Sequence, residues 1–207
     1  MTQTEEHTLA AVINALYQDA KYDKLKMLKG AAKSLFRSFK PENFEDAYLA
    51  ISKDQGEALV HFIQDKKLKN IVEFGTSFGI STLYLAQGVA KFGGYITTTE
   101  LLESKAKKAI NNFKKAGVES LIDIKVGDAL VTLKNYSNSI DLLVLDGWMD
   151  LYLPLFKLLE PNFYSNTHIY VDNANMTDSQ KFLSSIATDT YKIQSKFNGK
   201  VAIITVN

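Results

Sequence analysis

The 207-residue chain has no cysteine, only three prolines and no long hydrophobic run. The lack of cysteine excludes disulfides, thiolate nucleophiles and cysteine-ligated zinc sites. No stretch of about 18 apolar residues is present, so we expect no transmembrane helix and no association with membranes. Residues 1–7 are polar and acidic, and they lack the basic region and apolar core of a signal peptide. We therefore expect a soluble, cytoplasmic protein.

The charge of the chain is nearly balanced, with 24 lysines and arginines, 23 aspartates and glutamates, and a net charge of +1. This balance provides no overall field that would hold a nucleic acid or an anionic membrane, although it does not exclude a local patch. The hydrophobic fraction of 46% is typical of a globular protein. With 11 glycines and three prolines the chain shows no linker, and its length favours a single domain.

The first third of the chain carries apolar residues at helical spacing, which predicts three helices. The first two are defined by Leu9, Val12, Ile13, Leu16 and Tyr17, and then by Leu25, Leu28, Ala32, Leu35 and Phe36. Pro41 interrupts this pattern. The third helix is predicted over residues 54–66, with its apolar residues on one face.

From residue 70 onward, short apolar runs alternate with helical patterns. The runs predict strands at residues 71–74, 95–99, 121–126, 140–145 and 168–171. The intervening patterns predict helices near residues 80–91, 102–116, 128–135, 150–159 and 177–187. This alternation predicts an α/β fold with a parallel sheet and helices on both faces.

The C-terminal end departs from this alternation. Two strand-like runs, residues 191–197 and 200–206, are separated only by Asn198 and Gly199. Asn-Gly is a strong hairpin signal because both residues tolerate positive φ. We therefore expect the mostly parallel sheet to finish with an antiparallel hairpin.

A glycine-containing turn follows the first predicted strand and opens a helix. Gly75 and Gly79 would let the backbone approach a ligand, and the helix N-terminus with Ser81 would offer donors to a carboxylate. Glu100 ends the second predicted strand, where an acid can accept hydrogen bonds from both ribose hydroxyls. The alternative is a purely structural turn with a solvated Glu100. Together with Glu73 and with Asp128 at the end of the third strand, the pattern favours an adenosine-type ligand.

Acidic side chains also follow the next two predicted strands. Asp146 follows the fourth strand, and Asp172 and Asn173 follow the fifth, so adjacent parallel strands would bring them together. Two carboxylates and an amide oxygen are hard ligands that suit Mg²⁺, Ca²⁺ or Mn²⁺. Without a cation, one of these carboxyls would need a raised pKa. The structural alternative is that Asp172 or Asn173 caps a helix and Asp146 belongs to a loop.

These segments resemble the S-adenosylmethionine-dependent O-methyltransferases of the catechol and caffeoyl-CoA type. EFGTSFGIS at residues 73–81 is similar to that family's first motif, and ISKDQG at residues 51–56 to the segment upstream of it. DGWMDLYLP at residues 146–154 resembles the family's Asp-x-Trp-Lys-Asp-x-Tyr-Leu-Pro block. Asp172 and Asn173 resemble its metal-binding pair. The resemblance extends from about residue 51 to residue 175.

The resemblance implies a Rossmann-like class I methyltransferase fold with a seven-stranded sheet, in one domain over residues 1–207. Residues 1–50 would form a helical cap, and residues 51–207 would form the core that binds S-adenosylmethionine. The implied metal ligands for a divalent cation, foremost Mg²⁺, are Asp146, Asp172 and Asn173. The implied cofactor-binding residues are Ile51, Glu73, Gly75, Ser77, Gly79, Ser81, Glu100, Asp128, Ala129, Asp146 and Trp148.

The implied reaction is methyl transfer to a hydroxyl of a small catechol-like or phenolic acceptor, with Asp146 in the catalytic centre. The family's general base is a lysine, but this chain has Met149 at that position, and a thioether cannot take a proton. The cation alone, Asp150, or a lysine from the cap are possible replacements, and Met149 would then pack against substrate. Alternatively, the protein binds the cofactor and transfers methyl poorly.

A lysine-rich stretch occupies the predicted helix over residues 102–116. Its members are Lys105, Lys107, Lys108, Lys114 and Lys115. The ordinary interpretation is a solvated helix face. The alternative is a patch that guides tRNA, because some bacterial relatives act on modified tRNA, and it would imply a hydroxyuridine-type methyltransferase. The sequence leaves a homodimer open.

Overall fold

The protein is built around one seven-stranded sheet. The computed structural model describes residues 2–21, 45–48, 50–186 and 189–207. The strand order is β3-β2-β1-β4-β5-β7-β6, and only β7 and β6 are antiparallel to their neighbours. This confirms the predicted mostly parallel sheet with an antiparallel end. The strands are β1 Asn70–Phe74, β2 Tyr95–Glu100, β3 Ile122–Val126, β4 Leu142–Leu145, β5 His168–Val171, β6 Tyr191–Lys196 and β7 Val201–Val206.

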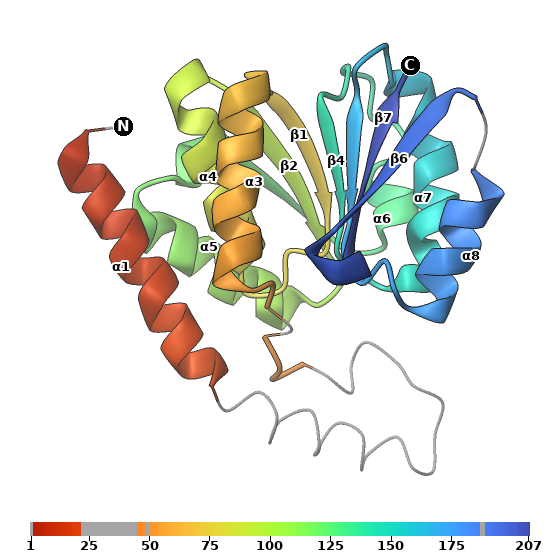
Figure 1. Ribbon diagram of the computed structural model, residues 1–207. Helices are drawn as coiled ribbons and strands as arrows, with labels where there is room; N and C mark the ends of the chain where they lie inside the picture. The colour runs from red at the N-terminus through yellow and green to blue at the C-terminus, as the bar shows by residue number, and fades with distance from the viewer. Residues whose placement is uncertain (1, 22–44, 49, 187–188) are drawn as a thin grey trace, which may run out of the picture.

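Helices cover both faces of the sheet (Figure 1). On one face lie α3 Lys53–Lys66, α4 Ile80–Val89 and α5 Glu103–Ala116, with α1 Gln3–Ala20 packed outside α4 and α5. On the other face lie α6 Ala129–Thr132, α7 Tyr152–Leu159 and α8 Thr177–Ser185. Short 3₁₀ helices include η4 Met149–Leu151, η5 Glu160–Asn162 and η6 Phe197–Gly199. Within the described residues, none of the helices combines the length and apolar character needed to span a membrane.

Two hydrophobic cores hold these layers together, one on each face of the sheet. Leu9, Ile63 and Leu83 belong to the core under α1, α3 and α4, and all are fully buried. Phe156 and Tyr152 belong to the core under α7, also fully buried. Central strands such as Leu142–Leu145 are buried at every position, because helices cover both sides of the sheet. This explains why the sequence shows apolar runs here instead of alternation.

The structure differs from the prediction at the C-terminal hairpin and at the helix predicted over residues 128–135. The hairpin loop holds residues 197–200 instead of Asn198 and Gly199 alone, because the strands pair only as far as Lys196 and Val201. Positive φ extends over Phe197, Asn198 and Gly199, so the turn begins one residue earlier than a two-residue loop would allow. The helix predicted over residues 128–135 is the single turn α6. The helix predicted from Leu25 to Phe36 lies outside the described residues.

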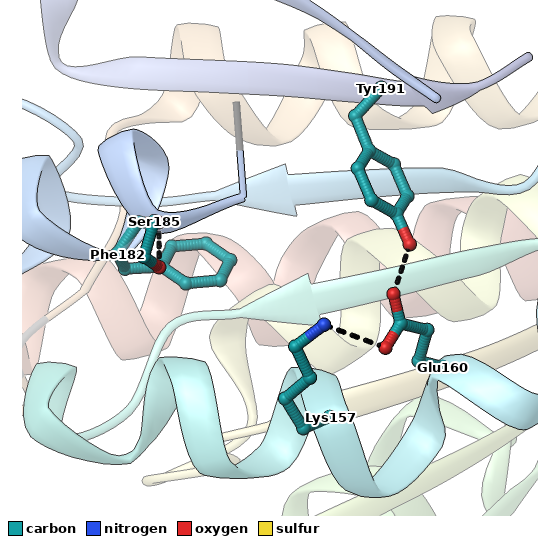
Figure 2. A network of polar contacts seen from close by, with 5 residues as sticks. All are labelled: Lys157, Glu160, Phe182, Ser185 and Tyr191. Atoms are coloured by element: carbon teal, nitrogen blue, oxygen red, sulfur yellow. Dashed lines mark hydrogen bonds and ion pairs between the residues drawn. The ribbon is translucent and has the colours of Figure 1, made fainter. Parts of the chain in front are cut away.

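A polar network ties the outer strand β6 to the end of α7 (Figure 2). The Tyr191 hydroxyl donates to the Glu160 carboxylate, which also accepts from Lys157 Nζ at 2.9 Å. The hydrogen bond from Lys157, followed by that from Tyr191, lowers the pKa of Glu160. Nearby in α8, the Ser185 hydroxyl donates to the Phe182 carbonyl at 2.7 Å. The contact between Tyr191 and Glu160 fastens β6, which has no strand on its outer side in the sheet.

His168 makes the stability of the fold depend on pH. Burial, followed by the charge of Lys66, lowers the pKa of His168. In the unfolded chain it takes up a proton near its ordinary pKa of about 6.5. Stability is therefore full above about pH 6.5 and falls as the pH drops toward the folded-state pKa. We expect His168→Gln to flatten the dependence of the unfolding free energy on pH between about 5 and 7. Urea denaturation at several pH values measures this dependence. His61→Gln, at an exposed position on α3, should keep the wild-type slope.

Candidate functional site

A cleft of about 510 Å³ opens at the carboxyl ends of the central strands. In the sheet, β2 and β3 lie on one side of β1, whereas β4 and the later strands lie on its other side. The cleft therefore opens at the point where the strand order reverses. Ligands of open α/β sheets bind at such a point, and the volume falls in the range of about 300–1,000 Å³ for small-molecule sites. The predicted site residues that line it are Ile51, Gly75, Ser77, Ser81, Glu100, Asp128, Ala129, Asp146, Trp148, Met149 and Asn173. Glu73, Gly79 and Asp172 stand behind the lining.

Glu100 is held in a fixed orientation at the end of β2. Its Oε2 accepts from the backbone N–H of Ser77 at 2.8 Å, and its Oε1 from that of Leu102 at 2.9 Å. Only 9% of Glu100 is exposed, so the interpretation of a solvated strand end does not hold. Each carboxylate oxygen keeps a lone pair that can accept another hydrogen bond from the cleft.

The two glycines of the turn are required by packing against protein. Gly75 has φ +106°, and a Cβ there would lie 2.6 Å from the backbone oxygen of Asp146. Gly79 has φ +90°, and its Cβ would lie 2.4 Å from the Phe113 ring. We expected these glycines to make room for a ligand. Their missing side chains let the β1 turn pack against the segment after β4 and against α5, and Gly75 also lines the cleft.

We expect Gly75→Ala to lower the free energy of unfolding by about 3 kcal/mol, because it adds a backbone clash to an unfavourable φ. Gly93→Ala is the matched control, since Gly93 also has positive φ (+64°) but an added Cβ meets nothing within 4 Å. The control should lose only about 1 kcal/mol. Urea denaturation of both variants measures the difference. Equal losses would show that the contact with Asp146 is unimportant.

The N-terminus of α4 faces the cleft with its first turn uncapped by any side chain. Free N–H groups at a helix N-terminus attract anions. Ser81 lies in this turn and lines the cleft. Glu73 is fully buried, and its Oε2 accepts from Thr82 and Thr98, each at 2.6 Å. Burial nevertheless raises the pKa of Glu73. Glu73 thus anchors the strand to the helix, and Ser81 lines the cleft.

Asp146 and Asp172 follow the paired residues Leu145 and Val171 of β4 and β5. Desolvation raises the pKa of Asp146 well above its ordinary value, and the neighbouring Asp172 carboxyl raises it further. Neither Asp172 nor Asn173 caps α8, whose N-cap is Met176. The strands thus bring the two carboxyls together, as the sequence predicted.

A second set of residues surrounds this carboxyl pair. Gln55 Nε2 donates to Asp172 Oδ1 at 2.8 Å, and Gln55 Oε1 accepts from Lys200 Nζ at 2.9 Å. The positive charge of Lys200 lowers the pKa of Asp146, opposing the effect of burial. Gln55 stands in the ISKDQG segment but had no predicted role, and Lys200 lies 145 residues away outside every motif.

The donor set around Asp146 suits a hard divalent cation. Two carboxyls compete for one region, and the Asn173 amide lies in the same cleft wall. The described part of the chain has no group of three or more histidine, aspartate or glutamate side chains that would form a protein-only cage. Any cation here would therefore need further oxygen ligands from water or substrate.

Met149 and Trp148 form the wall next to Asp146. Met149 begins η4 and is half-buried against the core under α7. Asp150 lines the same wall and is exposed. Asp128 lies across the cleft, beyond the end of β3, and caps α6 by accepting from Leu130 N at 2.9 Å.

Lys105 was wrongly assigned to a solvated helix face. Only 5% of it is exposed, and its Nζ donates to the Ala47 carbonyl at 3.0 Å. It also lies 5.3 Å from the centre of the Phe78 ring and lines the cleft. Its spacing to Ala109 and Phe113, four and eight residues on, places it on the buried face of α5. The other four lysines of the stretch are exposed.

The segment before α3 also contributes to the cleft. Tyr48, which carries no recognisable motif, lines the wall, and its carbonyl accepts from the Ser77 hydroxyl at 2.8 Å. The Ile51 carbonyl accepts from the Tyr17 hydroxyl of α1 at 2.9 Å. No residue of α1 itself lines the cleft.

Comparisons with known proteins agree with this geometry. The sequence model of a family described as O-methyltransferase matches residues 28–174. A catechol O-methyltransferase of Mycobacterium tuberculosis is 32% identical over 100 residues, which cover 48% of this chain and 45% of that protein. A catechol O-methyltransferase of Niastella koreensis is 34% identical over 82 residues, covering 40% and 37%. The matched segments thus span less than half of either curated relative.

The fold has counterparts among solved structures. The SAH-bound methyltransferase PaMTH1 of Podospora anserina superposes with a TM-score of 0.71 at 21% identity, covering 88% of each chain.

Proposed function

The chain belongs to the O-methyltransferase family, and from this premise we propose that it transfers a methyl group from S-adenosylmethionine to a hydroxyl of a small catechol-like or phenolic acceptor. The observation that carries the proposal is the convergence of Glu100 and Asp146 on one cleft, on either side of the Gly75 turn. Glu100 would bind the ribose of the cofactor, and Asp146 would lie next to the acceptor oxygen.

The cofactor would occupy the part of the cleft between β1 and β2. Glu100 would accept hydrogen bonds from the ribose hydroxyls, because its two oxygens are already aligned by backbone donors. The uncapped N-terminus of α4, with Ser81, would bind the methionine carboxylate. Asp128 and Ala129 would border the adenine. The cleft lining contains all of these groups.

The acceptor would occupy the end near Asp146, Trp148 and Met149. We propose Asp146, Asp172 and Asn173 as the residues that would hold a divalent cation, with Mg²⁺ favoured and Ca²⁺ or Mn²⁺ as alternatives. Such a cation would lower the pKa of an acceptor hydroxyl and would orient it for in-line attack on the methyl group. Trp148 would exclude water from one side of the acceptor.

The acceptor must also lose a proton, and Met149 cannot take it. Asp150 lies beside Met149 in the cleft wall and is our candidate for the group that receives the proton. A carboxylate is a weaker base than a lysine amine, so the proposal favours acidic phenols as acceptors.

The test is transfer of labelled methyl from S-adenosylmethionine to a panel of catechols and phenols, with added Mg²⁺ or Mn²⁺ and with EDTA. We expect product on vicinal diols, and we expect EDTA to reduce it. If S-adenosylmethionine binds in calorimetry but no acceptor yields product, the assignment as a transferase on diols is wrong.

Met149 in the cleft wall favours a second candidate, a protein that binds S-adenosylmethionine and transfers methyl only weakly. It predicts tight cofactor binding with little product on any acceptor. In either case we propose that residues 1–207 act as one methyltransferase domain, to which the segment before α3 contributes Tyr48 and Ile51.

A further inference from the structure

The Asp146 and Asp172 carboxyls lie side by side, because each directly follows one of the paired residues Leu145 and Val171 at the tips of β4 and β5. Asp172 is only 4% exposed, so water cannot compensate its charge well. The nearby residues must therefore supply hydrogen bonds or a counter-charge.

Gln55 supplies the hydrogen bonds and is fixed in one orientation. It is 1% exposed, and its Nε2 donates to Asp172 Oδ1 at 2.8 Å and to the Tyr170 hydroxyl at 3.1 Å. Its Oε1 accepts from Ser52 N at 3.1 Å and from Lys200 Nζ at 2.9 Å. The amide thus presents its donor end to the carboxyl pair and its acceptor end to the Lys200 ammonium.

Lys200 is brought to this place by the hairpin loop between β6 and β7. The Lys200 carbonyl accepts from Ala174 N at 2.7 Å, so the loop is tied to the residue directly after Asn173. The Lys200 side chain is half-buried, and Gln55 links its Nζ to the Asp172 carboxyl. The loop therefore delivers a cation to the same end of the sheet as the carboxyl pair.

We propose that Lys200 is a built-in counter-cation for the Asp146–Asp172 pair, held in place by Gln55, and that it weakens the binding of a divalent cation there. This proposal rests on the proposed function, because the cation site is the one proposed there at Asp146, Asp172 and Asn173. A like charge near a cation site disfavours binding, and the effect is largest at low salt. The loop between β6 and β7, which carries Lys200, would thus set the affinity of this site for a divalent cation.

The test is calorimetric titration of the full chain with Mn²⁺ and with Mg²⁺, without any acceptor, comparing wild type with Lys200→Met. We expect the variant to bind the ion about tenfold more tightly at low salt, because it removes a positive charge near two carboxyls. Lys200→Arg keeps the charge and should bind like wild type. Lys196→Met removes an exposed lysine from the end of β6 and should also have no effect.

Equal or weaker Mn²⁺ binding by Lys200→Met, or no binding by any variant, would overturn the proposal. If Lys200→Met folds poorly, Lys200→Gln replaces it, and the increase in Tm on addition of Mn²⁺ replaces the titration. This increase should be larger for Lys200→Gln than for wild type. Calorimetry with S-adenosylmethionine on the same samples tests the proposed function separately. Failure to bind S-adenosylmethionine would contradict the proposed function. The role of Lys200 would still be decided by the comparison of ion affinities between wild type and Lys200→Met.

Discussion

Replacing Glu100 with alanine is expected to weaken the binding of S-adenosylmethionine about 100-fold, equivalent to about 2.7 kcal/mol. The variant removes an acceptor that would take hydrogen bonds from both ribose hydroxyls, and bonds to a charged group contribute about 1.5–3 kcal/mol each. The backbone N–H groups of Ser77 and Leu102 have already fixed this carboxylate in the free protein. Isothermal titration calorimetry measures the change in Kd.

The matched control is Glu103→Ala. Glu103 lies three residues away on α5, is exposed, and pairs with Lys107 on the same helix. It should bind the cofactor like wild type. Glu100→Gln should lose less than Glu100→Ala because it retains one acceptor oxygen. If Glu100→Ala keeps the wild-type Kd while its Tm is unchanged, Glu100 does not contact the ribose.

The sequence predicted the sheet because its signals are local. The central strands, such as β4, are apolar at every position, and the helices between them show their apolar faces at regular spacing. The site acids were predicted for the same reason, since Asp146 and Asp172 each directly follow an apolar run and Glu100 ends a run of β-branched residues. Strand pairing then fixes their neighbourhood, and Leu145 pairs with Val171 as that argument requires.

What the sequence did not predict depends on contacts between distant segments. Lys105 is charged, yet the Ala47 carbonyl and the Phe78 ring receive its ammonium inside the fold. Gln55 and Lys200 meet only because α3 and the hairpin loop lie at the same end of the sheet. The loop is wider than the Asn-Gly pair suggests, and its fourth residue is Lys200 itself. Local sequence patterns do not predict contacts between residues so far apart in the chain.

The largest gain in activity is expected from Met149→Lys. Met149 lines the cleft beside Asp146, so a lysine there places an amine next to the acceptor hydroxyl. A general base contributes about 10²–10⁴ in rate, and we expect kcat on catechol to rise about 100-fold. Because the amine must be neutral to take a proton, the gain should grow with pH up to the pKa of the new lysine. A pH–rate profile of methyl transfer measures both effects.

Met176→Lys is the control for Met149→Lys, because it adds the same charge at an exposed methionine outside the cleft lining. It should leave kcat unchanged. The role of Asp150 follows from a double-mutant cycle. If Asp150 receives the proton in wild type, Asp150→Asn should slow wild type and have little effect in the Met149→Lys background, where the new amine has taken over. If Met149→Lys is no faster at any pH, the absent base does not limit the reaction, and orientation of the acceptor at Asp146 must do so.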